Sequence, residues 1–521
     1  MLKKLFSRVR GRSADYGWQP RGRGHRVMRI LIIVAVITLA LRMFWGWRTG
    51  RQVRQTFEQL RQSGAALVLS ELQGPEVPPA EDAWDDYVRL CARIAEEQMG
   101  IGPLATHARA RGKEITDQQQ AIAESYEADR HALERFRQAA AEPQQWSQDL
   151  RPRLARRADL LELVTAAGGR PSIQWRLNDD IARPMDLELT GLLQYVPVTT
   201  DDGETLYPLQ PQALTTLLRL LSAQCLDQYQ QGHLQQAVSS LETVLRCVSH
   251  AGLSPWAQVQ ALQDDVMADV ALALQIMMAD ESQALTQTAN LRELLKPTDV
   301  RPDLRTALAF GQAILCAFYN DAVTDPATFK QRAWLWAFRP FHDQQLVAAV
   351  KTIELARKTL DKPMGHIPSQ IRELSVGIDR SNIAQAVLLD LRDASHSAVV
   401  AEAYRRLTLV ALAVYEYRQQ HGDLPETLEA LCPDYLEALP SDPMTDGSLG
   451  FVRQGDAPRI YSAGLDGVDN NGAYDLADDP LGRDGRDLCW FFNGLPAAPD
   501  PPAQPAPPAA APEAAGPNSP N

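Results

Sequence analysis

The residues best suited to chemistry are a run of aspartates near the C-terminal end of the chain. Seven lie between positions 466 and 487: Asp466, Asp469, Asp475, Asp478, Asp479, Asp484 and Asp487. Only Arg483 and Arg486 offset them locally, so the carboxylates repel one another unless a cation or water spreads the charge. Calcium suits this composition because it takes about 6–8 oxygen ligands in flexible geometry. The residues alone leave two interpretations open: a structural calcium site, or a solvated acidic loop.

Two short motifs stand just before these aspartates. The first is the turn LPSDP at residues 439–443, and the second is YSAGLDG at residues 461–467. Upstream, the spacing of apolar residues predicts a long helix over 398–420 and a short, proline-started helix over 424–431. Short strand candidates follow the first motif, and Trp490 closes the segment.

In this order, the segment resembles the globular head of the major pseudopilin of type II secretion. That family has the same two motifs and a calcium loop that closes in an Asp-x-Asp and a Trp. Here Asp484, Asp487 and Trp490 match the closing element only in kind, because their spacing differs. The chain also departs from the family at its apolar N-terminal run, which has no preceding Gly-Phe and no Glu inside it. Prepilin cleavage and pilus assembly are therefore not implied.

The resemblance implies a small α+β module over residues 396–494, with strands over 450–453 and 459–462, that a structural calcium ion stabilises. The ligands we expect are, in order of preference, the carboxylates of Asp466, Asp484 and Asp487 and the backbone carbonyl of Leu465, followed by Asp469, Asn471 and Asp475. Cys432 and Cys489 flank the module. They are interpreted either as a disulfide that closes it or as two small buried side chains.

The elements that position this module begin at a predicted membrane anchor. Residues 30–41 are apolar except for Thr38, and extension through Trp47 reaches about 27 Å at about 1.5 Å per residue, close to the thickness of a hydrocarbon core. Arg42 interrupts the extension near one end, where it can snorkel to the headgroups. Trp45 and Trp47 are placed as an interfacial aromatic belt would be. A cleaved signal peptide and a buried core helix are the alternatives.

The charge of the chain is uneven. The total is 52 Lys+Arg against 65 Asp+Glu, but residues 1–54 carry 13 basic residues and only Asp15 as an acid. The positive-inside rule then places residues 1–29 in the cytoplasm and the body outside it, on the periplasmic side of the inner membrane. The remaining body has a net charge of −25, which makes nucleic acid an unfavourable partner.

The rest of the chain is predicted to be mainly α. We expect a juxtamembrane helix and linker over 48–79 and a helical body over 80–395, built as a bundle or an irregular solenoid. Residues 212–250 suggest one helical hairpin, either an ordinary antiparallel pair or a single tetratricopeptide-type unit. Residues 495–521 are rich in Pro and Ala and are expected to be disordered.

The sequence carries no familiar catalytic motif. It has no P-loop, no His-Glu-x-x-His, no Gly-x-Ser-x-Gly and no Cys-x-x-Cys. We therefore expect a non-catalytic, single-pass envelope protein with a scaffolding, adhesion or secretion-accessory role, whose partners are envelope or secretion-apparatus proteins. The alternative is an envelope hydrolase whose site is assembled in space by the helical body.

Overall fold

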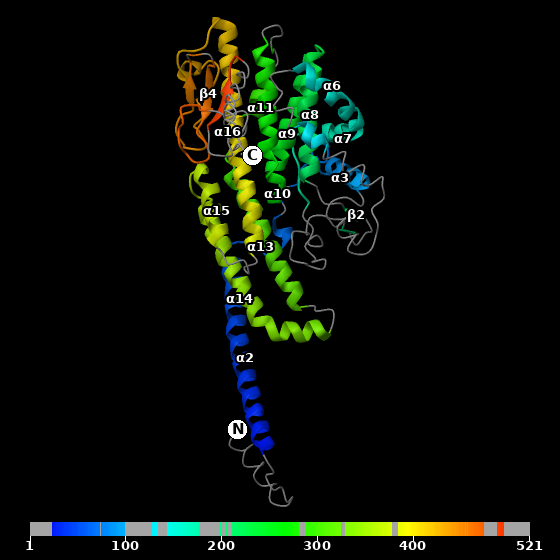
Figure 1. The fold of residues 1–521 in the computed structure, drawn as a ribbon, viewed down its shortest axis with the longest axis vertical. Coiled ribbons are helices and arrows are strands. Elements are labelled where there is room, and N and C mark those ends of the chain that lie inside the picture. The colour runs from blue at the N-terminus through cyan, green and yellow to red at the C-terminus, as the bar shows by residue number, and fades with distance from the viewer. Residues whose placement is uncertain are drawn as a thin grey trace, which may run out of the picture. The chain divides into compact units, whose positions relative to one another are not determined.

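The chain is mainly helical in the computed structural model, as the sequence predicts (Figure 1). The structure describes residues 23–72, 74, 76–98, 128–133, 143–176, 198–199, 205–206, 211–280, 285, 288–324, 329–377, 384–453, 455, 457–473 and 487–493. The predicted tail at 495–521 and most of the basic segment at 1–29 lie outside these residues. The fold divides into two compact units. Met1–Ala65 with Tyr319–Lys351 form the N-terminal unit, and Ala66–Phe318 with Thr352–Asn521 form the body unit.

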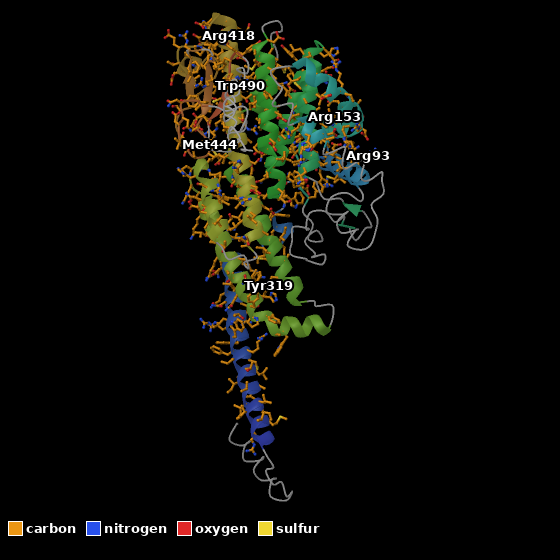
Figure 2. The ribbon with its side chains drawn as sticks, viewed as in Figure 1. Arg93, Arg153, Tyr319, Arg418, Met444 and Trp490 are labelled. Carbon is orange, nitrogen blue, oxygen red and sulfur yellow. The ribbon has the colours of Figure 1, made fainter. Side chains whose placement is uncertain are left out.

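The N-terminal unit is dominated by α2, Arg23–Gln62, which changes character along its length. The apolar residues of its first half are exposed, with Ile30 at 59% and Leu41 at 64%. Figure 2 shows the side chains of this half standing free along the helix. From Thr49 onward the helix has a buried face that includes Val53 and Leu60. The sequence predicted a juxtamembrane helix and linker over 48–79, and in the structure a single helix continues from the apolar run to Gln62.

This buried face packs against the end of α13, Arg301–Thr324, and the start of α14, Phe329–Thr359. Asp343 is fully buried there and accepts hydrogen bonds from the Thr49 hydroxyl (2.7 Å) and from the Tyr319 hydroxyl. Pro340 lies inside α14, where its ring removes a backbone hydrogen bond and bends a helix. Before this point, the first part of α14 extends sideways from α2 (Figure 1).

The body unit is a layered array of helices. Its helices are α3 Trp84–Gln98, α6 Pro143–Arg156, α7 Ala158–Gly168, α8 Pro211–Gln230, α9 Leu234–Gly252, α10 Ala257–Gln260, α11 Gln263–Ala279, α12 Ala289–Leu294, α15 Ile367–Gly377 and α16 Ala384–His421, with 3-10 turns η1 Leu69–Leu72, η3 Met364–His366 and η4 Leu428–Leu431. The hairpin of α8 and α9 turns at Gly232, whose φ of 80° favours glycine. Helices α6 and α7 pack on one side of the hairpin, α11 packs on the other, and α16 packs on α11 (Figure 1).

An aromatic cluster joins several of these helices. Trp175 lies at its centre, with ring-centroid distances of 6.0 Å to Tyr87 and 5.4 Å to Trp256. His250 meets Tyr87 edge-on, and its backbone carbonyl accepts the Trp175 indole N–H at 3.3 Å. Trp175 belongs to an irregular segment, residues 173–176, that follows a β-bridge between Asp82 and Ser172.

Helix α16 is the central element of the body unit. Every residue from Ser397 to Tyr415 is buried, so the helix is covered on all sides rather than on one face. Inside it, Glu402 accepts hydrogen bonds from Arg406 (2.7 Å) and from the Thr298 backbone N–H (2.9 Å). Arg406 in turn donates to the Ser441 carbonyl at 2.7 Å. A helix buried all round therefore carries its charges in paired form.

The C-terminal module is a small antiparallel sheet on α16. Its strands are β3 Gly450–Val452, β4 Arg459–Ser462 and β5 Leu488–Phe491, in the order β3-β4-β5. A separate antiparallel pair consists of β1 Val198–Thr199 and β2 Thr205–Leu206. Strands β4 and β5 contact α16, and the Phe491 N–H donates to the Gln275 side chain of α11 at 3.2 Å. Helix α16 itself runs through residues 395 and 396, where the sequence placed a domain boundary.

Candidate functional site

The two motifs of the C-terminal module meet at Asp442. This carboxylate is buried, and it accepts hydrogen bonds from the Ser462 hydroxyl (2.6 Å) and the Ala463 backbone N–H (2.9 Å). It also accepts the Met444 N–H at 2.9 Å, which closes its own turn. The LPSDP turn therefore holds the end of β4 in place. The acidic loop leaves β4 at this point.

A second buried carboxylate, Asp487, organises that loop from the start of β5. Its two oxygens accept the backbone N–H groups of Gly472 (2.7 Å) and Asn470 (3.1 Å). Burial raises the pKa of Asp487, and these backbone donors oppose the shift. Asp487 therefore acts as an internal acceptor for the loop.

On its inner side the loop is held by Arg459 of β4. The guanidinium donates to the carbonyls of Gly472 (2.8 Å) and Asn471 (3.3 Å). Gly472 has a φ of 71°, and a Cβ there would lie 2.6 Å from the Arg459 Nε. Glycine is needed at this position both for its backbone conformation and for this close approach.

The remaining predicted ligands that the structure describes lie at the exposed tip. Asp466 and Asp469 are both exposed, and each accepts a backbone N–H two residues ahead, from Val468 (2.9 Å) and Asn471 (2.7 Å). Leu465 is half-buried at the start of this turn. Asp475 and Asp484 lie outside the described residues. Within the described ranges, no three His, Cys, Asp or Glu side chains are grouped so that they could hold a metal ion.

The loop also sets the environment of its neighbours. Burial, and next the Asp469 carboxylate, raise the pKa of Tyr461 to about 12. Cys432 and Cys489 are both free thiols, so the disulfide interpretation is wrong. The alternative of two small buried side chains is met only in part, because both cysteines are half-buried. The Cys489 thiol is directed to the Gly472 carbonyl at 3.5 Å instead of toward Cys432.

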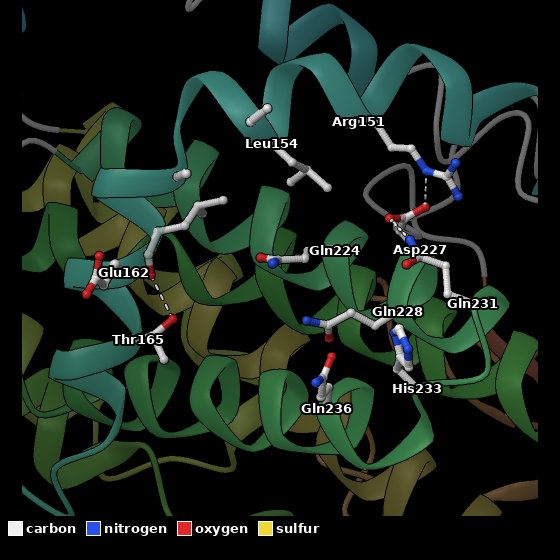
Figure 3. Close-up of a pocket in the computed structure, with 13 residues that line it drawn as sticks. Arg151, Leu154, Glu162, Thr165, Gln224, Asp227, Gln228, Gln231, His233 and Gln236 are labelled. Atoms are coloured by element: carbon white, nitrogen blue, oxygen red, sulfur yellow. Dashed lines mark hydrogen bonds and ion pairs between the residues drawn. The ribbon is translucent and has the colours of Figure 1, made fainter.

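A cavity of about 640 Å³ lies between α6 and α7 on one side and the α8–α9 hairpin on the other. Leu154 and Leu161 supply part of its apolar wall. Its polar wall includes four side-chain amides, from Gln224, Gln228, Gln231 and Gln236, beside charged groups and a threonine (Figure 3). This cavity was not predicted from the sequence. Gln224, Gln228 and Gln231 are spaced by four and three residues, which places them on one face of a helix. This spacing could have indicated the polar wall of the cavity.

The ionisable groups of this cavity do not converge. Asp227 is engaged by the Arg151 guanidinium (2.8 Å) and by the Gln231 amide (2.6 Å). Glu162 and His233 line opposite ends in the view of Figure 3. General acid–base catalysis needs both groups within reach of one reacting atom. The lining of this cavity is better suited to binding a ligand that has both polar and apolar surface than to proton transfer.

Comparison with known proteins returns no relatives for this arrangement. No protein-family model matches the chain, and no curated protein or solved structure matches it.

Proposed function

We propose that the chain is a single-pass, membrane-anchored protein of the cell envelope that acts by binding other proteins rather than by catalysis. The first half of α2 would span the inner membrane, with residues 1–29 in the cytoplasm and the body unit on the periplasmic side. The role would be scaffolding, adhesion or assistance to a secretion apparatus. The C-terminal module would be of the pseudopilin-head type and stabilised by calcium.

The observation that carries this proposal is the change in burial along α2. By length and composition, α2 is the one helix within the described ranges that could cross a membrane, and none of its apolar stretch is buried. The core-helix alternative would need that stretch to be covered by protein. Beyond Thr49, the same helix packs normally against its unit. An exposed apolar half followed by a packed half is what a lipid-facing span joined to a folded domain requires.

The cavity beside the α8–α9 hairpin supports binding as the activity. Glutamine amides offer both donors and acceptors, which complement the peptide groups of an extended polypeptide. Leu154 and Leu161 would take its apolar side chains. The separated positions of Glu162 and His233 make the hydrolase alternative the weaker one.

Calcium remains part of the proposal for the acidic loop. Among the described residues, the groups that fit are the exposed carboxylates of Asp466 and Asp469 and the carbonyl of Leu465, all oxygen ligands that calcium accepts. The ion would supply positive charge that relieves repulsion between the carboxylates. Asp487 would order the loop from within by its backbone hydrogen bonds, and the Arg459 guanidinium would keep the Gly472 and Asn471 carbonyls turned away from the ion.

Topology is tested with paired reporters in the full chain. Alkaline phosphatase joined after residue 65 should be active, whereas green fluorescent protein at the N-terminus should fluoresce in the cytoplasm. An N-terminal epitope should stay on the membrane-bound chain. Loss of that epitope with release of the body would support the cleaved signal instead, and the opposite reporter pattern would overturn the orientation.

Binding is tested by placing a photo-crosslinking amino acid at Gln228 or Gln236. Envelope proteins should be captured from these positions but not from Val376, an exposed control on α15 at 77%. Equal capture at all three positions would contradict a specific role for the cavity. A hydrolytic activity lost in both Glu162→Gln and His233→Gln would favour the hydrolase.

A further inference from the structure

The first part of α14 carries large aromatic side chains that are about half exposed. Trp336 is 56% exposed, Phe338 is 48% exposed and Phe341 is 44% exposed. The segment is also basic by sequence, with Lys330 and Arg332 near its start. Exposed apolar surface of this kind marks an interaction site, because a soluble surface normally avoids it.

Two contacts tie this segment to one level of α2. The Arg42 guanidinium lies 5.0 Å from the centre of the Trp336 ring, and its Nε donates to the Ala337 carbonyl at 3.0 Å. One turn further along, Gly46 lies against Pro340, since a Cβ on this glycine would be 3.7 Å from the proline ring. Arg42 is the first residue after the apolar run of α2. The aromatic segment therefore meets α2 where the proposed span ends.

The neighbouring part of α2 also carries exposed aromatic side chains. Trp45 and Trp47 are 40% and 58% exposed, on either side of the glycine that contacts Pro340. Tryptophan rings prefer the headgroup level of a bilayer, where one end is apolar and the other is hydrated. Figure 1 shows the segment extending sideways from α2, so a span perpendicular to the membrane would leave it parallel to the membrane surface.

We propose that the Phe329–Phe341 part of α14 is an interfacial helix that lies in the outer surface of the membrane beside the end of the span. Its aromatic side chains would enter the boundary between headgroups and acyl chains, and the Arg339 side chain, which is 53% exposed, would meet lipid phosphates. Trp-rich composition and continuity with the apolar face of α2 favour lipid over a protein partner. This inference rests on the proposed membrane anchor.

The test measures depth in the full chain, reconstituted in vesicles of phosphatidylethanolamine and phosphatidylglycerol. A polarity-sensitive fluorophore is attached to Phe338→Cys, to Ile33→Cys within the span, and to Val376→Cys as the aqueous control. The parent chain, whose described cysteines are buried or half-buried, gives the labelling background. Quenching is compared between lipids with a nitroxide near the headgroup and lipids with a nitroxide deep in the acyl chain.

At Phe338 we expect blue-shifted emission and quenching mainly by the shallow nitroxide, at a depth of about 5–10 Å into the boundary. The probe at Ile33 should be quenched by the deep nitroxide, and the probe at Val376 by neither. A water-like probe at Phe338, or one that is protected but unquenched because protein or a second copy covers it, would overturn the interfacial helix while the anchor stood. If the Ile33 probe also escaped quenching, the anchor itself would fail.

Discussion

Asp442 and Asp487 show how single buried carboxylates shape the C-terminal module. Each accepts backbone N–H groups from a segment distant in sequence, Ala463 for Asp442 and Gly472 for Asp487. A hydrogen bond to an ionised acceptor is worth about 1.5–3 kcal/mol, so each carboxylate is a strong local constraint. Asp466, by contrast, is exposed and bonds only within its own turn among the contacts described above.

This difference predicts that substitutions of Asp487 and Asp466 will respond differently to calcium. Asp487→Asn should lower the free energy of unfolding by about 1.5–3 kcal/mol whether or not calcium is present, because a neutral and weaker acceptor replaces the ionised acceptor of two backbone N–H groups. Asp466→Asn should leave the chelated protein unchanged and reduce only the rise in melting temperature that calcium produces. Calorimetry of the full chain in detergent, with calcium or with chelator, measures both. No calcium-dependent shift in the parent chain would refute the metal site, and a calcium-dependent effect of Asp487→Asn alone would make it a ligand.

His250 gives the body unit a defined acid sensitivity. Burial lowers its pKa from 6.5 to about 4, and the Arg246 charge acts in the same direction while Asp82 opposes it. Between pH 6.5 and pH 4, His250 is therefore mainly neutral in the folded chain and mainly protonated in the unfolded chain. The contribution of His250 to the free energy of unfolding should therefore fall by about 3 kcal/mol as the pH drops from above 6.5 to 4. Asp303, whose pKa is raised by burial to about 6, contributes in the opposite direction below that pH.

Urea unfolding followed by tryptophan fluorescence at several pH values in this window measures the effect. His250→Asn should be less stable than the parent chain at pH 7.5, since it loses the packing against Tyr87. Its stability should nevertheless depend less steeply on pH. A variant with the same slope as the parent would show that other groups cause the acid sensitivity.

At the scale of elements, α16 depends on charges that its own sequence supplies. Glu402 and Arg406 lie one turn apart and are both buried, and the pair reaches the LPSDP turn through Ser441. Removing one partner of a buried pair leaves an uncompensated charge, which costs about 3–5 kcal/mol. We expect Glu402→Gln to lower the free energy of unfolding of the body unit by about 3–5 kcal/mol.

The matched control is the exposed pair of Arg392 and Asp393 on the same helix. Asp393→Asn should cost at most about 1 kcal/mol, because exposed ion pairs contribute little. Chemical denaturation of the two variants beside the parent chain gives the comparison. Equal losses would mean that burial does not govern the strength of these pairs.

The regular elements could be predicted from sequence because local periodicity determines them. The spacing that predicts helices over 212–231 and 234–250 corresponds to α8 and α9, and the strand candidates at 450–453 and 459–462 correspond to β3 and β4. The first part of α14 could not be predicted, because Pro340 reads as a helix boundary and its aromatic residues lack an apolar stripe. The bonds of Asp442 and Asp487 were also beyond prediction, since they join segments by tertiary packing alone.

At the scale of the molecule, the N-terminal unit has its own stabilising centre in Asp343. Its partners Thr49 and Tyr319 belong to the same unit. Asp343→Asn should cost about 1.5–3 kcal/mol in that unit, because a charged acceptor is lost.

Hydrogen exchange of the full chain in detergent localises the change. Faster exchange is expected in residues 49–60 and 340–350, with the exchange of α8 and α11 unchanged. Faster exchange throughout α8 and α11 would contradict the independence of the two units.

The position of β5 at the end of the described chain determines when the body can finish folding. It contacts α16 and α11, yet it follows the end of α16 by 66 residues, from His421 to Leu488. At about 5–20 residues per second, ribosomes need roughly 3–13 s to make that interval. During this time α11 and α16 have been synthesised but β5 has not, so the apolar surface that β5 covers on these helices is exposed and can aggregate. Biosynthesis should therefore depend on a holding chaperone at the compartment where the body emerges, and slow codons before residue 488 should increase that dependence.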